Sequence, residues 1–126
     1  MQHGVVNRVS AVVNSLEALI SQSRSIETVQ KRDLRCGDRV VVTTKNSVYT
    51  VWVLGNEEYW VWGGWFDLQG MSPQRIAING CTWGGSAILR NVVAARGLHL
   101  EFGNRVVTTQ IQRVRVIPAD TRIHPN

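Results

Sequence analysis

The chain has 126 residues, of which 44% are hydrophobic and 18% are charged, and its net charge is +5. These values are typical of one folded domain and exclude an intrinsically disordered chain. No apolar run approaches the roughly 18–20 residues needed to cross a bilayer, and the N-terminus lacks the basic segment and continuous apolar block of a secretory signal. We therefore expect a small basic protein of the cytoplasm with no membrane partner.

Arginine supplies most of the positive charge, because only two of the 14 basic residues are lysines. Arginine is suited to bidentate contacts with phosphate or carboxylate, although a net charge of this size is also ordinary for a small domain. Two cysteines, Cys36 and Cys81, are too few for a disulfide framework. We expect two buried or half-buried thiols, and a single bridge between them is not excluded. The histidines have no ligand spacing relative to the cysteines, so the sequence predicts neither a metal site nor a cofactor.

Residues 5–20 have the apolar period of an amphipathic helix, with steps of three and four. Its apolar side chains are Val5, Val9, Val12, Val13, Leu16, Leu19 and Ile20. Valine lowers helix propensity, so the helix needs something to pack on, either the domain's own sheet or the same helix of another subunit. The polar stretch that follows is typical of a linker. We divide the chain into this helix with its linker (residues 1–33), an antiparallel β domain (34–118) and a C-terminal tail (119–126).

Three consecutive strands are predicted between Arg39 and Phe66, a stretch that contains four of the five tryptophans. If Lys45-Asn46 is a two-residue loop, Val42 faces Tyr49 and Val40 faces Val51. This pairing makes one apolar face, while the opposite face carries a mixed set of side chains that includes Trp52.

The turn near Gly55 decides where Trp60 and Trp62 lie. An even number of loop residues places them on the valine face, and an odd number places them beside Trp52 on the outer face, because a shift of one residue turns every side chain over. Gly-Asn is a suitable two-residue loop, and burial of an indole removes about 150–250 Å² from water. We therefore favour the core position for both tryptophans.

The rest of the chain predicts further short strands separated by glycine-rich turns. The stretch from Arg75 to Asn79 is one strand, the Gly97–Phe102 stretch points Leu98, Leu100 and Phe102 inward, and residues 112–117 alternate. Six or seven short strands without crossover helices predict a mainly β fold, a small antiparallel barrel or sandwich. By analogy alone, the hairpin spacing is similar to that of SH3-like and Sm-like barrels, but the chain has no motif specific to either group.

Enzyme activity is the class with least support. A nucleophile would be Cys81 or Ser86, with His99 as base and Asp67 or Glu101 as the orienting acid. His99 lies between two leucines in an alternating strand and is expected to face solvent, without a nucleophile elbow. The glycine-rich stretch around Trp83 lacks the lysine of a phosphate-binding loop.

Protein interaction or assembly is the function that the sequence favours, and self-association is its simplest form. The helix needs a partner, aromatic residues lie near flexible glycines, and edge strands must be covered or paired. The interface that we expect consists of Val9, Val13, Leu16, Ile20, Trp52, Trp65, Phe66 and Trp83.

Binding of single-stranded RNA or DNA is the alternative. Small β domains bind single strands by stacking bases on aromatic side chains while basic side chains follow the backbone. Trp52, Trp65 and Trp83 are the expected platform, and the expected phosphate contacts are Arg39, Arg75, Arg113 and Arg115. Against this hypothesis, the sequence has no continuous basic run.

Overall fold

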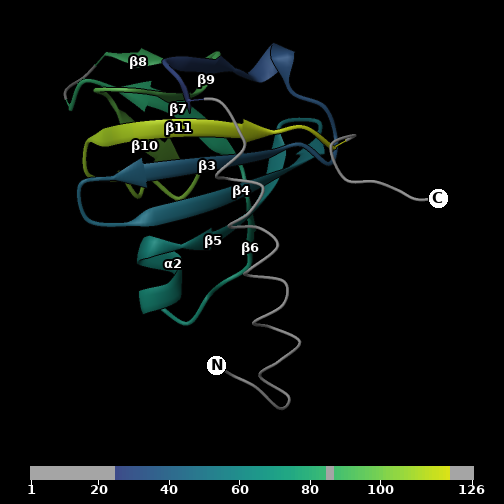
Figure 1. Cartoon of the computed structure of the whole chain (residues 1–126). Helices are drawn as coiled ribbons and strands as arrows, with labels where there is room; N and C mark the ends of the chain where they lie inside the picture. Colours follow the sequence, from purple (N-terminus) through teal and green to yellow (C-terminus); the bar gives the residue numbers. More distant parts are fainter. Residues whose placement is uncertain (1–24, 85–86, 120–126) are drawn as a thin grey trace, which may run out of the picture.

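Residues 25–84 and 87–119 are described by the computed structural model, and within them the chain is mainly β (Figure 1). One antiparallel sheet has the strand order β1-β11-β3-β4-β5-β6, a second has the order β10-β7-β8, and a third pairs β2 with β9. The strands of the large sheet are β1 (Ser25–Ile26), β11 (Ile111–Ile117), β3 (Arg39–Thr44), β4 (Val48–Gly55), β5 (Glu58–Gly63) and β6 (Gln74–Ile76). Those of the small sheets are β10 (His99–Phe102), β7 (Ile78–Thr82), β8 (Ile88–Leu89), β2 (Thr28–Gln30) and β9 (Val92–Ala95). The predicted mainly β class is confirmed, and none of these sheets closes on itself over the described residues.

The paired region begins before the predicted domain boundary at residue 34. Strand β1 pairs with the C-terminal strand β11, and β2 pairs with β9. The described part of the predicted linker is therefore two short strands followed by a 3-10 turn, η1 (Lys31–Asp33). Apolar periodicity missed β2 because it buries only one side chain, that of Val29. The predicted helix over residues 5–20 and the tail from residue 120 lie outside the described residues.

The β3–β4 hairpin has the predicted register. Val42 lies opposite Tyr49, and Val40 lies opposite Val51. All four side chains are buried, as expected for directly opposed residues that share one face of a sheet. Alternation of apolar and mixed residues was therefore sufficient to predict this part of the core.

The β4–β5 hairpin contains an extra residue that the sequence did not reveal. Its loop is Asn56-Glu57, whose φ angles of 54° and 59° are the left-handed values of a type I′ turn. Val53 pairs with Tyr59, but the next pair is formed by Gly55, so Leu54 is inserted into β4 as a β-bulge.

This bulge decides where the tryptophans of β5 lie. Trp60 is opposite Trp52, while Val61 is opposite Val51. The two valines are fully buried, whereas Trp60 and Trp62 are half-buried on the other face. The core position that we favoured for Trp60 and Trp62 is therefore wrong, because one extra residue on β4 reverses the parity of the connection.

A short helix, α2 (Gly64–Leu68), follows β5 and carries an aromatic side chain into the core. Phe66 is fully buried, and its ring centre lies 4.8 Å from that of Phe102 and 6.2 Å from that of Tyr49 in edge-to-face geometry, which is a favourable arrangement for aromatic pairs. Phe66 was predicted to be part of a partner interface, and its burial removes it from that set.

The strand predicted from Arg75 to Asn79 is divided between two sheets. Strand β6 pairs with β5 in the large sheet, whereas β7 pairs with β10 in a small one. The chain changes sheets at Ala77, which belongs to neither strand. Each half is too short to show a break in its own alternation, so the change was not predictable from the pattern.

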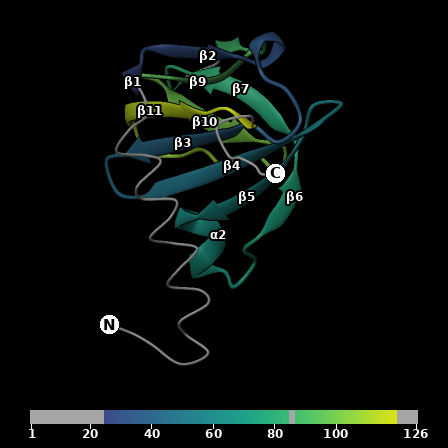
Figure 2. The ribbon, with the colours of Figure 1, turned by 45° about the vertical axis from the view of Figure 1, so that its right-hand side comes forward.

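One hydrophobic core is shared by all three sheets. In Figure 2, β2, β9 and β7 lie above β11 and β3. Leu98, Leu100 and Phe102 point into the core, as predicted. Val42 and Val61 enter the same cluster from the large sheet. The large sheet therefore has one face on the core and one face turned away from it.

Candidate functional site

Three indoles gather on the face of the large sheet that is turned away from the core. Trp60 lies opposite Trp52, and Trp62 lies opposite Thr50. The ring centres of Trp52 and Trp62 are 6.3 Å apart. All three indoles are half-buried, whereas Val41, opposite Thr50, is only 3% exposed. We define the indole face as Val41, Thr50, Trp52, Trp60 and Trp62.

The four arginines predicted to contact phosphate lie on the same side of the sheet as these indoles. Arg39 is opposite Trp52, and Arg75 is opposite Trp60. On β11, Arg115 is opposite Val41. Arg113 lies two residues before Arg115, so both side chains point to the same face of the sheet. Strand pairing therefore collects basic side chains that are scattered over 77 positions of the sequence, from 39 to 115 inclusive.

Arg39 and Arg75 each contact a neighbour on this face. The guanidinium carbon of Arg39 lies 5.6 Å from the ring centre of Trp52, which is a cation–π contact. Arg75 donates from Nε to Glu58 Oε1 at 2.8 Å, and both side chains are largely exposed. Glu58 alternates with Trp60 on β5, so it shares this face and offsets one of the four positive charges.

The remaining tryptophans proposed for a platform lie in other parts of the fold. Trp65 is half-buried in α2, where its ring packs edge-on against Phe66 and its backbone N–H donates to the Tyr49 hydroxyl at 3.0 Å. Trp83 follows β7 in a small sheet and is 59% exposed. The expected trio of Trp52, Trp65 and Trp83 is thus not assembled on one sheet face, and Val9, Val13, Leu16 and Ile20 lie outside the described residues.

Sequence reasoning assigned Trp60 and Trp62 to the core, although they are the natural neighbours of Trp52. One signal pointed to their actual position. Gly55 precedes two residues that both adopt positive φ, and glycine at the start of such a loop is typical of a bulged hairpin.

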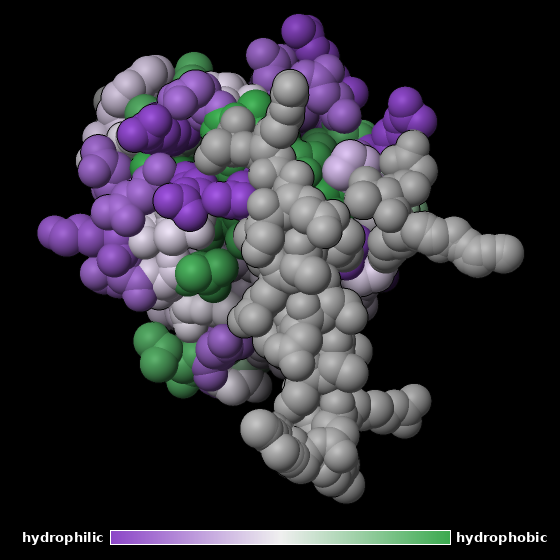
Figure 3. Space-filling model, in the orientation of Figure 1, coloured by the Kyte–Doolittle hydropathy of each residue, from purple (hydrophilic) through white to green (hydrophobic). Residues whose placement is uncertain are grey.

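A second apolar surface lies at α2. Leu68 is 83% exposed, and Met71 and Val48 are also exposed. Figure 3 shows green, hydrophobic surface at its lower left, over α2 and the adjoining end of the sheet. This surface adjoins the indole face, because Val48 lies two residues before Thr50 on β4 and points to the same side of the sheet.

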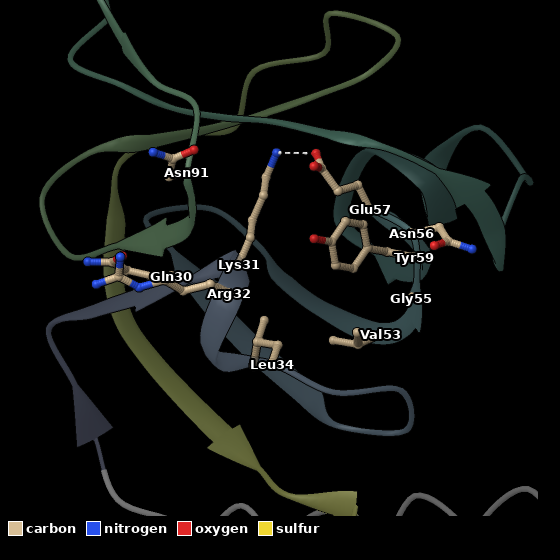
Figure 4. A pocket seen from close by; sticks show the side chains of 10 residues that line it. All are labelled: Gln30, Lys31, Arg32, Leu34, Val53, Gly55, Asn56, Glu57, Tyr59 and Asn91. Atoms are coloured by element: carbon tan, nitrogen blue, oxygen red, sulfur yellow. Dashed lines mark hydrogen bonds and ion pairs between the residues drawn. The ribbon is translucent and has the colours of Figure 1, made fainter.

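A cleft of about 460 Å³ separates η1 from the β4–β5 hairpin (Figure 4). Lys31 crosses it: its ammonium group donates to the carbonyl oxygen of Ile78 at 2.7 Å and lies 3.3 Å from Glu57 Oε1. Leu34, Val53 and the ring of Tyr59 supply apolar walls. Burial, and next the charge of Glu57, raises the pKa of Tyr59 to about 12, so its hydroxyl stays protonated.

Of the two nucleophiles considered for catalysis, Ser86 lies outside the described residues and Cys81 is not placed to react. Cys81 is fully buried and lies 3.5 Å from the carbonyl oxygen of Val93, and burial raises its pKa to about 12. A thiol in that environment stays protonated. Nδ1 of His99 is 2.9 Å from the carbonyl oxygen of Thr108. Cys36 is exposed, so the expectation that both thiols are buried or half-buried is wrong for this residue, and it forms no disulfide with Cys81.

The described part of the chain has neither a cluster of metal-ligating side chains nor a membrane-spanning helix. Residues 25–84 and 87–119 contain no group of three or more His, Cys, Asp or Glu side chains placed to hold a metal ion. They also contain no helix that is long and apolar enough to span a bilayer. Comparisons of the chain with protein-family models, with curated proteins and with solved structures found no match.

Proposed function

We propose that this chain is a cytoplasmic protein-interaction and assembly domain that self-associates through the indole face. The observation that supports the proposal is the presence of three half-buried indoles on the sheet face turned away from the core. Outward positions of an antiparallel sheet are usually polar. Complete burial of one indole removes about 150–250 Å² from water, worth roughly 4–6 kcal/mol. Completing the burial of three half-buried rings would favour association.

The arginines of this face fit the same proposal. Trp and Arg are enriched among the residues that dominate protein interfaces, and here they alternate across neighbouring strands. The Arg39–Trp52 contact holds a charge against an aromatic ring, and Arg75 is bound to Glu58. Such a surface can bury its apolar rings while the guanidinium groups of the exposed Arg75 and Arg113 contact acids or carbonyl oxygens of a partner; Arg39, 8% exposed, holds its neighbour Trp52 in place. We also propose that the three sheets enclose the shared core in the manner of a small sandwich or barrel.

The partner segment that we propose is residues 5–20 of a second copy, with Val9, Val13, Leu16 and Ile20 on its contacting side. A helix of 16 residues is about 24 Å long. Six neighbouring strands are also about 24 Å across, because they are spaced by about 4.8 Å. The length of the segment therefore matches the width of the sheet that it would cover.

Light scattering on the full chain over a range of concentrations tests this function. We expect the wild type to be oligomeric and the Leu16→Asp variant, which places a charge on the apolar side, to be monomeric. The matched control is Asn14→Asp, which adds the same charge on the opposite side of the predicted helix and should leave the oligomer unchanged. A wild type that is monomeric at every concentration contradicts self-association.

Single-stranded nucleic-acid binding is a second candidate, because all four predicted phosphate contacts share a face with three indoles. Each phosphate contact on a single strand contributes about 0.7 to the slope of log affinity against log salt. Loss of Arg113 and Arg115 should therefore reduce the slope by about 1.4. The control is alanine at Arg90 and Arg96, which are exposed elsewhere. Absence of oligonucleotide binding at low salt contradicts this candidate.

A further inference from the structure

The cleft between η1 and the β4–β5 hairpin contains a polar group that the fold itself does not satisfy. Tyr59 is 3% exposed as a residue, and no hydrogen bond joins its hydroxyl to another described residue, although this oxygen is not among the fully enclosed polar atoms that lack a partner. Buried tyrosine hydroxyls usually have one, and that of Tyr49 in the same sheet accepts from the N–H of Trp65. In Figure 4 the Tyr59 hydroxyl points into the cleft, toward the side chain of Lys31. The hydroxyl therefore opens onto the cleft, where water or a ligand can be its hydrogen-bond partner.

The walls of the cleft suit a small molecule with an apolar part. The volume of about 460 Å³ is within the range of small-molecule sites, about 300–1,000 Å³. Leu34 and Val53 form one apolar side, and the ring of Tyr59 supplies a flat surface beside them. These walls come from separate parts of the chain, namely the segment after η1 and the two strands of the hairpin. A ring or short chain placed there would be shielded from water on more than one side.

The charges around the cleft favour an anion. Lys31 is fixed in place by the carbonyl oxygen of Ile78 at 2.7 Å, and its side chain is only 15% exposed. Arg32 lines the cleft as a second cation, whereas Glu57 is the only acid among the lining residues. The Lys31–Glu57 contact is long at 3.3 Å, and Glu57 is 74% exposed, so the pair is held weakly. A ligand carboxylate can replace Glu57 at the ammonium group.

We propose that this cleft is a binding site for a small organic anion whose carboxylate contacts Lys31 and the Tyr59 hydroxyl while its apolar part packs against the Tyr59 ring. The Tyr59 hydroxyl carries its proton at neutral pH, already at the ordinary pKa of 10.0 and more so in its buried position, so it donates to the carboxylate. The site is independent of the indole face and does not require self-association. The carboxylate would accept one hydrogen bond from a charged donor, Lys31, and one from a neutral donor, the Tyr59 hydroxyl.

Titration of the full chain with benzoate, followed by amide NMR shifts, tests the proposal. The matched neutral probe is benzamide, which has the same ring without the charge. We expect benzoate to shift the amides of Gly55, Asn56 and Tyr59, and to bind at least about tenfold more tightly than benzamide, a difference of about 1.4 kcal/mol. Equal binding of the two probes, or shifts that avoid the hairpin, would overturn the site.

Three variants assign the contacts. Tyr59→Phe removes only the hydroxyl and should weaken benzoate about two- to tenfold, with little effect on benzamide. Lys31→Met should remove the preference for benzoate, and Lys45→Met, in the β3–β4 loop, is the control that should keep it. Glu57→Gln removes the competing acid and should tighten binding of benzoate. If Tyr59→Phe and Glu57→Gln both bind benzoate as the wild type does, the assignment is wrong, whatever the folding of Lys31→Met.

Discussion

Gly63 holds the register on which the position of the three indoles depends. It lies opposite Tyr49 at the end of the β4–β5 ladder, with φ of 100° and ψ of 179°, a region that is essentially restricted to glycine. A Cβ atom at this position would overlap the carbonyl oxygen of Val48 and would lie 3.4 Å from the Cα of Tyr49. Both neighbours are main-chain atoms, so no side-chain rotation relieves the overlap.

Gly55 provides a matched control for this substitution. Its φ is 103°, close to that of Gly63, but a Cβ atom there would meet nothing within 4 Å. Backbone strain of this kind costs about 1–3 kcal/mol, so Gly55→Ala should lose about that much of the free energy of unfolding. Gly63→Ala carries the same strain and must also separate β4 from β5, which sacrifices ladder hydrogen bonds worth about 0.5–1.5 kcal/mol each. We expect Gly63→Ala to lose at least about 2 kcal/mol more than the control.

Urea unfolding followed by tryptophan fluorescence measures both variants on the same scale, provided that the m values agree. The difference between the two losses isolates the main-chain overlap, because the strain is common to both. If the losses agree within about 0.5 kcal/mol, Gly63 does not face Val48 and Tyr49, and the register that places Trp60 and Trp62 on the outer face is refuted. A Gly63→Ala chain that fails to fold, beside a folded Gly55→Ala, agrees with the register.

Three further predictions concern the buried groups. Alkylation of the native protein should modify the exposed Cys36 and spare the buried Cys81 until urea unfolds the chain; rapid modification of both thiols in the native state would contradict the burial. Burial raises the pKa values of Tyr59 and Cys81 from 10.0 and 9.0 to about 12, so the folded state keeps protons that the unfolded chain releases. Their contribution to the free energy of unfolding is complete below about pH 9 and falls as the pH rises toward 12. In urea unfolding measured at several pH values, Tyr59→Phe should lose less stability with rising pH than the wild type. An identical pH dependence for the two proteins would contradict the burial of the Tyr59 hydroxyl. The Asp38 carboxylate accepts from the N–H groups of Arg35 and Ala119, each at 2.8 Å. Asp38→Ala should therefore cost about 2–3 kcal/mol, against less than about 0.5 kcal/mol for the exposed Asp33→Ala, and equal thermal midpoints for the two variants would show that these bonds contribute little.

The parts of the fold that were predictable are those governed by local alternation. The register of β3 and β4 followed from valines at every second position and a short polar loop, and the inward side chains of β10 followed from the same period. The Gly37-Asp38 step before β3 is also local in its chemistry, since Gly37 has φ of 94° and Asp38 accepts from the N–H of Arg35. Each of these features depends on neighbours within a few residues.

What was missed depends on one residue or on distant pairing. The bulge at Leu54 has no signature in the composition or the hydrophobic pattern of the β4 sequence, but it moves Trp60 and Trp62 to the other face of the sheet. The chain changes sheets at Ala77 because β6 pairs with β5 whereas β7 pairs with β10. The local pattern of apolar residues holds no information about these distant partners. The cleft around Tyr59 is likewise formed by η1 meeting a hairpin that begins 15 residues later, at Val48 after Asp33.

The candidate site was predicted in part. The four arginines were named from their strands and do share a face, because pairing of β11, β3, β4, β5 and β6 brings their outward positions into line. Their aromatic neighbours were mostly misassigned: of the tryptophans named with them, Trp52 lies on the same face, whereas Trp65 is in α2 and Trp83 follows β7. The bulge in the β4–β5 connection is the reason that Trp60 and Trp62, the other aromatic neighbours of these arginines, were not named.

Nuclear Overhauser contacts from the Trp60 indole in the full chain give the most direct test of where the aromatic rings of β5 point. The structure predicts contacts with the side chains of Trp52 and Arg75, its cross-strand neighbours. Contacts with Val51 or Phe66, both fully buried, would place the ring inside the molecule. In that case the outward aromatic surface would not exist, and the proposed assembly through it would fail.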